Sequence, residues 1–574
     1  MTIWYADDTP SRRYPMYTRG NVGEVFPSVV SPLTWSLFGP ETEAGWREAF
    51  VRFGGFTPDE YGDEPKVIVG VFGGYCYLNV SLIRILAVRL PGMTVEAMDH
   101  QFFGEADAPP YAPRLSDRDR WATLRLGRTL VRTLRATALP ELDGDKHDIE
   151  AWRSRLPDPA AATDDELIAV IRDFRPIFRR LFDHHIHVTF QATVGPGLVQ
   201  QICADKLGEP ELPVTLLSGI GDVESAEPSG HLWDLGRMVA GDAAVTACFD
   251  AGLAGLEERL ASAPAADRFR KELAMFTEAF GSRGPNEWEG SSPTWGTEPG
   301  LALAAIDRMR LAAAGHDPRR RSLELERERI SETARVRRRL RPPTRLQFDW
   351  ALRSATLFSQ GRERSKTTVI RALHEVRLRQ LELARRCRAR GGPDDLHDMW
   401  LVAHEDLEDY AADPGAWRPR LAERAQLRDR LSRLVPPFVF DAAQAPPEEW
   451  DARGASAVHL TAGAELHGIA GCPGVARGRA RVVLDPIDPR GLGPGEVLVA
   501  PITDPSWTPL FLSAEAVIVD VGAQMSHAVI VARELGIPAV VSVTGATQRI
   551  ADGTLVEVDG STGVVRVLEA PPVA

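Results

Sequence analysis

The sequence changes character across one proline-rich stretch, residues 435–456. This stretch reads VPPFVFDAAQAPPEEWDARGAS, with proline pairs, small residues and no amphipathic period, which is typical of a linker. Before it, apolar residues recur at three- and four-residue steps over long segments, which is the spacing of amphipathic helices. After it, short β-branched runs alternate with Gly, Pro and Asp, which indicates strands. The chain is therefore expected to contain at least two differently built units.

The length of the chain supports this division. Single hydrophobic cores stop growing beyond roughly 250–300 residues, and this chain has 574. We predict a multidomain α+β protein with a mainly helical body over residues 1–434, a linker over 435–465 and a C-terminal α/β domain over 466–574.

Composition restricts the classes of partner. The formal net charge of -13 argues against a nucleic acid or an anionic membrane as the main partner. The five cysteines are far apart and lack metal-ligand spacing, which favours reduced thiols. The N-terminus lacks the pattern of a signal peptide, and no apolar run is long enough for a membrane span. These features predict a soluble, cytoplasmic protein.

One histidine in the C-terminal part stands out by its position. Residues 520–541 read DVGAQMSHAVIVARELGIPAVV, in which Ser526 and His527 open a predicted helix that Gly536 and Pro538 end. Unpaired backbone N–H groups and the helix dipole favour an anion at a helix start. A phosphoryl group on His527 would be stabilised there, although a structural histidine fits the same position.

Four segments around this histidine resemble a known domain. Between residues 466 and 568 the chain contains LHGIAGCPGVARGRARVV, EVLVAPITDPSWTPLF, AVIVDVGAQMSHAVIVARELGIPAVV and DGTLVEVDGSTGVV. In this order they resemble the phosphohistidine swivelling domain of phosphoenolpyruvate-utilising enzymes, which include phosphoenolpyruvate synthase and pyruvate phosphate dikinase. The resemblance implies that His527 is the phosphorylated histidine. Ala523 stands where a second glycine of the turn is usual in that family.

The helical body carries a narrower resemblance. Segments such as TRGNVGEVFPSVVSPLTWS, LLSGIGDVESAEP, FGSRGPNEWEGSSPTW and GRERSKTTVIRALHEVR are similar to the substrate-binding and linking region of rifampin phosphotransferases. That family places an ATP-grasp domain before the substrate domain and the swivelling domain. Here the resemblance starts near residue 14, and the sequence has no Gly-rich phosphate loop followed by lysine. We therefore expect no cofactor bound by a recognisable motif, and a separate ATP- or phosphoenolpyruvate-binding subunit that supplies phosphate in trans, with Mg2+ accompanying that donor.

Five residues of the body are candidates for substrate binding. His184 and His187 share a helix face in the segment HHIH, where a cavity lining, ordinary packing or a metal site are the alternatives. Arg283 and Glu287 lie in GSRGPNEWEG, as a phosphate clamp and a base or as a structural ion pair. Glu224 follows the glycines of LLSGIGDVESAEP, which bring backbone amides near a ligand or simply form a turn.

Three functions follow from these patterns. The first is a phosphotransferase-like enzyme that acts on a hydroxyl-bearing small molecule through His527. The second is a stand-alone dehydratase or lyase of specialised metabolism in which His527 is a general acid or base. The third is a non-catalytic binder of a bulky hydrophobic ligand.

Overall fold

The structure is a computed structural model. It describes residues 4–103, 110–312, 317–441, 449–452, 459–484, 492–493, 495–503, 507–511, 513–522 and 526–570.

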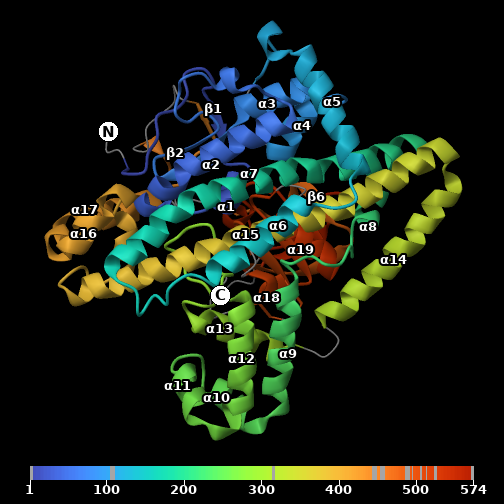
Figure 1. The fold of residues 1–574 in the computed structure, drawn as a ribbon. Helices are drawn as coiled ribbons and strands as arrows, with labels where there is room; N and C mark the ends of the chain where they lie inside the picture. The colour runs from blue at the N-terminus through green and yellow to red at the C-terminus, as the bar shows by residue number, and fades with distance from the viewer. Residues whose placement is uncertain are drawn as a thin grey trace.

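Two very long helices form the axis of the body (Figure 1). Helix α7 spans Asp164–Ile202 and α15 spans Pro342–Ala389, and they pack along each other with α2, Pro32–Phe53, on the other side of α7. A capping box starts α7, in which Thr163 and Glu166 each satisfy the other's backbone N–H. The segments of α7 and α15, for which the sequence predicts helices, are therefore helical in the structure.

The two long helices approach each other closely at one glycine. A Cβ atom at Gly195 of α7 would lie 2.4 Å from the backbone nitrogen of Ala355 in α15. Any side chain there would force the helices apart, because backbone atoms cannot yield as a flexible side chain can. This contact fixes the spacing of α7 and α15 beside the site described below.

A small sheet covers the N-terminal end of the body. Its order is β2 (Val69–Phe72), β3 (Tyr75–Asn79), β1 (Met16–Thr18) and β4 (Val439–Asp441), and β4 pairs antiparallel with β1. Strand β4 lies inside the segment predicted as a linker. The chain therefore returns to the N-terminal sheet after the last body helix, while residues 442–448 and 453–458 of the predicted linker lie outside the described residues.

Further helices complete the body. These helices are α1 (Val22–Val25), α3 (Val80–Arg89), α4 (Val95–Phe103), α5 (Arg120–Arg135), α6 (Pro140–Arg153), α8 (Leu212–Leu216), α9 (Glu227–Gly241), α10 (Ala243–Asp250), α11 (Leu256–Ser262), α12 (Asp267–Phe280), α13 (Pro299–Leu311), α14 (Pro318–Arg339), α16 (Leu407–Ala412) and α17 (Pro414–Ser432). Of these, α9 to α13 project from the body at the bottom of Figure 1.

The C-terminal part is an α/β domain built on an eight-stranded sheet in the order β5-β12-β11-β7-β8-β9-β10-β6. Strands β7 to β10 are parallel neighbours, and the other pairs are antiparallel. This confirms the predicted fold class. The elements are β5 (Glu465–His467), β6 (Ile469–Cys472), β7 (Val475–Val482), β8 (Glu496–Ala500), α18 (Thr508–Phe511), β9 (Ala516–Val519), α19 (His527–Leu535), β10 (Ala539–Val541), α20 (Ala546–Arg549), β11 (Leu555–Asp559) and β12 (Val564–Glu569).

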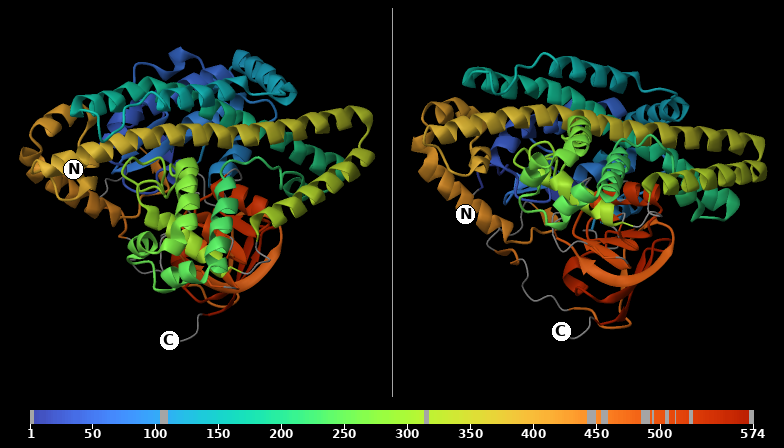
Figure 2. Two further views of the ribbon diagram at one scale, coloured as in Figure 1. Left: turned by 60° about the horizontal axis from the view of Figure 1, so that its bottom comes forward. Right: turned by 90° about the horizontal axis from the view of Figure 1, so that it is seen from below.

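The C-terminal domain is docked on the body. Figure 2 shows it beneath the long helices, next to α9 and α14. One continuous apolar cluster joins side chains of α9 to α13, such as Trp233 and Ile306, with side chains of the C-terminal sheet and α19, such as Val529 and Val541. Helix α14 also contacts α19. The orientation of α19 relative to the body is thus set by packing.

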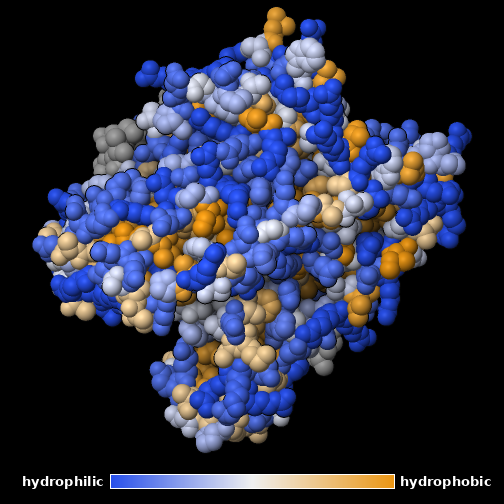
Figure 3. Space-filling model, viewed as in Figure 1, coloured by the Kyte–Doolittle hydropathy of each residue, from blue (hydrophilic) through white to orange (hydrophobic). Residues whose placement is uncertain are grey.

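The surface seen in Figure 3 is mainly hydrophilic, with small hydrophobic areas between the long helices. In the part of the chain that the structure describes, no helix combines the length and the apolarity that crossing a bilayer requires.

Candidate active site

Helix α19 is built as its sequence predicts. The side chain of Ser526 is the N-cap and accepts a hydrogen bond from the backbone N–H of Val529 at 3.4 Å. Gly536 ends the helix with a φ of 64°, a left-handed conformation that glycine adopts without strain. His527 is the first helical residue. Its side chain lies outside the described part of the structure, as does Ala523, so the role of His527 stays a prediction.

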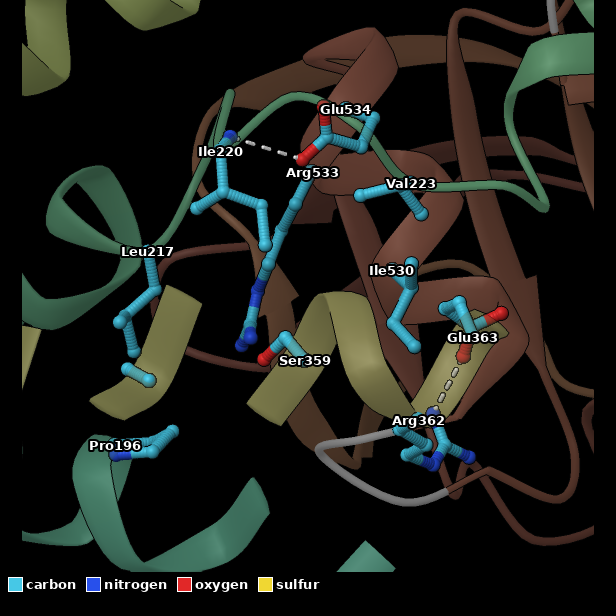
Figure 4. A pocket seen from close by; sticks show the side chains of 11 residues that line it. Pro196, Leu217, Ile220, Val223, Ser359, Arg362, Glu363, Ile530, Arg533 and Glu534 are labelled. Atoms are coloured by element: carbon cyan, nitrogen blue, oxygen red, sulfur yellow. Dashed lines mark hydrogen bonds and ion pairs between the residues drawn. The ribbon is translucent and has the colours of Figure 1, made fainter. Parts of the chain in front are cut away.

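A pocket lies between α19 and the body (Figure 4). Its walls come from α7, from the segment 217–223, from α15 and from α19, so it exists only while the C-terminal domain is docked. Most of its lining is apolar, and one side is polar. The lining residues are Pro196, Leu217, Ile220, Val223, Ala355, Ser359, Arg362, Glu363, Ile530, Arg533 and Glu534.

The polar side of the pocket leads into a buried ion pair. Arg362 Nη1 lies 3.0 Å from Glu363 Oε1, drawn as a dashed line in Figure 4. Burial alone would raise the pKa of Glu363, but the positive charges of Arg362 and Lys366 outweigh it and hold this pKa below its usual value. Glu363 is therefore an ionised carboxylate at the pocket wall.

Arg283 and Glu287 lie together with Lys366 in a buried cluster. Arg283 Nε lies 3.2 Å from Glu287 Oε2, and Lys366 Nζ lies 3.0 Å from Glu287 Oε1. The side chains of Arg283 and Glu287 are 3% and 1% exposed, so both charges are held almost entirely in the protein interior. Arg283 also acts electrostatically on Glu363, which makes this cluster continuous with the pocket wall.

One hydrogen-bond donor of this cluster has no acceptor among the described residues. Arg283 Nη1 donates to Thr367 Oγ1 at 3.3 Å, whereas Arg283 Nη2 has no hydrogen-bond partner among the described residues. A buried donor without a partner costs on the order of 1–3 kcal/mol, and more when it is charged. An anionic oxygen is the partner that a guanidinium group binds best.

The loop that carries Arg283 and Glu287 is held from two sides. Arg377 of α15 donates to the backbone carbonyls of Glu287, Glu289 and Gly290 at 3.0–3.1 Å. The carboxylate of Glu289 accepts hydrogen bonds from Ser31 at the start of α2. Glu289 and Arg377 therefore have structural roles that place the charged cluster.

The two predicted histidines lie elsewhere. His184 Nδ1 lies 2.5 Å from Asp145 of α6, and this hydrogen bond raises the pKa of His184. Burial lowers the pKa of His187 to about 4, and this ring contacts Phe53 of α2. Both side chains thus face α6 and α2, and the structure does not bring them together with Arg283 and Glu287.

His185, which lies between His184 and His187 in the sequence, is the histidine of this segment that lies next to the charged residues of α15. His185 Nδ1 lies 2.9 Å from Ser365 Oγ on α15. Burial lowers its pKa to about 3, and Arg362 and Lys366 add to that effect, so the ring is neutral. Within the described residues no group of three His, Cys, Asp or Glu side chains is arranged to hold a metal ion.

Glu224 lies in the glycine-containing segment between α8 and α9, and Glu534 of α19 contacts the same segment. Glu224 forms an ion pair with Lys146 at 3.1 Å and is partly exposed, outside the pocket lining. Glu534 of α19 is buried and accepts a hydrogen bond from the backbone N–H of Ile220 at 3.3 Å. In the structure, a backbone N–H group of this segment faces a side chain of the C-terminal domain, so the predicted role of Glu224 in substrate binding stays a prediction.

Sequence reasoning missed His185, Arg362, Glu363 and Lys366. The last three lie in GRERSK, which the family resemblance includes without distinguishing its members. A usable signal was the presence of Gly361 and Ser365 among the charges, because small residues in a charged helix indicate a close contact on that face.

Comparison with known families agrees with this arrangement. Residues 492–563 match the mobile domain of PEP-utilising enzymes, and residues 184–363 match the fourth domain of rifampicin phosphotransferase. The first match contains α19, and the second contains Arg283, Glu287, Arg362 and Glu363 but ends before Lys366. The C-terminal part is therefore similar to the mobile domain of PEP-utilising enzymes, and a segment of the body is similar to the fourth domain of rifampicin phosphotransferase.

Three relatives make the likeness more specific. Rifampicin phosphotransferase of Streptomyces sviceus is 29% identical over 334 residues, 55% of this chain and 37% of that protein. The uncharacterized phosphotransferase YvkC of Bacillus subtilis is 26% identical over 427 residues, 71% of this chain and 50% of that protein. The prodigiosin synthesizing transferase PigC of Serratia marcescens is 30% identical over 298 residues, 52% of this chain and 33% of that protein. The match thus spans half or less of each relative.

Proposed function

We propose that this chain is a phosphotransferase-like enzyme in which His527 passes a phosphoryl group to a hydroxyl group of a small molecule. The observation that carries the proposal is the pocket itself, because α19, which begins at His527, contributes Ile530, Arg533 and Glu534 to the lining that also contains Arg362 and Glu363. The names of the relatives support the class of reaction.

Phosphoryl transfer needs in-line positioning and neutralisation of charge on the equatorial oxygens. As the bond between the imidazole nitrogen and phosphorus breaks, a bond between the acceptor oxygen and phosphorus forms, and the hydroxyl proton passes to the released imidazole. Arg362 and the cluster of Arg283 and Lys366 supply positive charge next to the pocket. Glu363, held ionised, can accept a hydrogen bond from the acceptor hydroxyl and orient it.

The phosphate donor is part of the same proposal. We infer a separate ATP- or phosphoenolpyruvate-binding domain or subunit that phosphorylates His527 when the C-terminal domain is not docked on the body. Glu287 and Glu363 are both paired with cations, so they are poor ligands for a divalent cation. Mg2+ would therefore be bound mainly through the phosphates of the donor.

Labelling tests this function. Wild-type protein and the His527→Ala variant are incubated with labelled ATP or phosphoenolpyruvate, each alone and with lysate of the source cells. The proposal predicts acid-labile, alkali-stable label on the wild type and none on the variant. Wild-type protein that stays unlabelled under all of these conditions contradicts it.

The same preparations separate the alternative functions. Turnover by the wild type in phosphate-free buffer, without nucleotide or partner, would favour the dehydratase or lyase in which His527 acts as acid or base. Saturable binding of an apolar ligand without any turnover would favour the non-catalytic binder.

A further inference from the structure

Glu534 joins the C-terminal domain to the body at one defined point. Its carboxylate accepts the hydrogen bond from the backbone N–H of Ile220, shown dashed in Figure 4. Burial raises the pKa of this carboxyl, and the backbone N–H groups of Gly219 and Gly221 and the charge of Arg329 also act on it and partly oppose that shift. A carboxylate from one domain therefore sits among three consecutive backbone amides of the other, an arrangement that binds anions.

The segment that receives Glu534 is rigidly held. Gly219 has a φ of 58°, and a Cβ atom there would lie 2.6 Å from the backbone nitrogen of Glu326 in α14. Arg329 of α14 donates to the carbonyl of Gly219 at 3.1 Å, and Gln360 of α15 donates to that of Gly221 at 3.0 Å. Because its carbonyls are fixed to two body helices, the amides of this segment are preorganised for the carboxylate.

The position of Glu534 in α19 gives the contact a consequence for the site. Glu534 is seven residues after His527 in the same helix, about 10 Å along its axis at 1.5 Å per residue. Ile530, one turn before Glu534, lines the pocket with Arg362 and Glu363. Fixing the C-terminal end of α19 therefore fixes where the helix begins relative to the pocket.

We propose that Glu534 is a positioning residue that holds the C-terminal domain docked on the body, with the start of α19 at the pocket. The docking role stands on the contacts alone. Its effect on phosphoryl transfer rests on the function proposed above. Without Glu534, the apolar contacts remain, but the three amides lose their anionic partner.

Paired spin labels test the docking in the chain of 574 residues. Cysteines replace Leu346 on α15 and Val475 on β7, both exposed, and Cys248 is changed to Ser because the other four native cysteines are buried. We expect one narrow distance distribution with Glu534 present. In Glu534→Ala a second, broader distribution should appear, because the loss of a charge-assisted hydrogen bond shifts the ratio of docked to undocked molecules about tenfold or more. Glu534→Gln keeps one acceptor oxygen, so its undocked fraction should be intermediate between those of the wild type and Glu534→Ala.

A matched control and a stability measurement complete the test. Glu515 is an exposed glutamate of the same domain, and Glu515→Ala should leave the distance distribution unchanged. Identical distributions for Glu534→Ala and the wild type would overturn the proposal. It would also be overturned if Glu534→Ala unfolded the C-terminal domain, seen as loss of its β-sheet circular dichroism, because Glu534 would then be structural. None of these readouts needs phosphate, so they are independent of the labelling experiment.

Discussion

At the scale of single residues, the most consequential arrangement is the buried charge cluster around Glu287. Two cations share its carboxylate, and removing one partner of a buried charge network is costly because the remaining charges have lost their hydration. Lys366 provides the cleaner test, because Arg283 also contacts Thr367.

We predict that Lys366→Met lowers the free energy of unfolding by about 1–3 kcal/mol and strongly reduces transfer to the acceptor. The matched control is Lys146→Met, which removes an ion pair whose lysine side chain is 49% exposed. Exposed pairs contribute about 1 kcal/mol or less. Denaturant unfolding of both variants checks the stability part. Equal losses of unfolding free energy in Lys366→Met and Lys146→Met would contradict a stabilising role of the cluster.

The His184–Asp145 pair predicts a pH dependence of stability. The pKa of His184 is raised in the folded protein, so its contribution is fully present below the unfolded value of about 6.5 and is lost as pH rises through the folded pKa. His184→Gln lacks this contribution. The difference in Tm between wild type and variant should therefore be largest near about pH 6 and shrink towards about pH 9. A difference that grows with pH would contradict the assignment.

At the scale of elements, the segment 217–223 and α14 form one structural unit, and two glycines in it give a matched pair. Both have left-handed backbones, at 58° for Gly219 and 69° for Gly221, but only Gly219 is crowded by α14. We predict that Gly221→Ala costs about 1 kcal/mol from its backbone conformation, whereas Gly219→Ala costs about 2–4 kcal/mol because a steric clash is added. Thermal unfolding measures the stability of both variants. Equal losses of stability would show that α14 shifts to make room for the added methyl group at residue 219.

The sequence could predict elements whose cause is local, and it failed where the cause is a distant partner. The capping box of α7 and the Ser526-to-Gly536 frame of α19 are local signals, and both helices are present. Strand β4 was missed because its hydrogen-bond partner β1 lies at the other end of the chain. His185 was missed for the same reason, since helical spacing shows which residues share a face but not which helix covers that face.

At the scale of the whole molecule, phosphoryl transfer through His527 requires a C-terminal domain that can leave the body and return. The proline-rich segment predicts limited proteolysis between residues 442 and 458, which should release the C-terminal domain as one resistant fragment. Mass spectrometry of the early fragments locates the cuts. First cuts inside the sheet of residues 465–569, with the segment before it intact, would contradict an independent domain.

The central claim is that His527 carries a phosphoryl group, and the most direct measurement is tandem mass spectrometry of the peptide that contains it. The protein is incubated with the phosphate donor and lysate, then digested and separated at neutral to alkaline pH, since phosphohistidine is labile in acid. We expect one added phosphoryl group on His527, which disappears on brief acid treatment and is absent from His527→Gln. A stable phosphate on another residue of the peptide, or turnover by a wild type whose His527 is never modified, would contradict the claim.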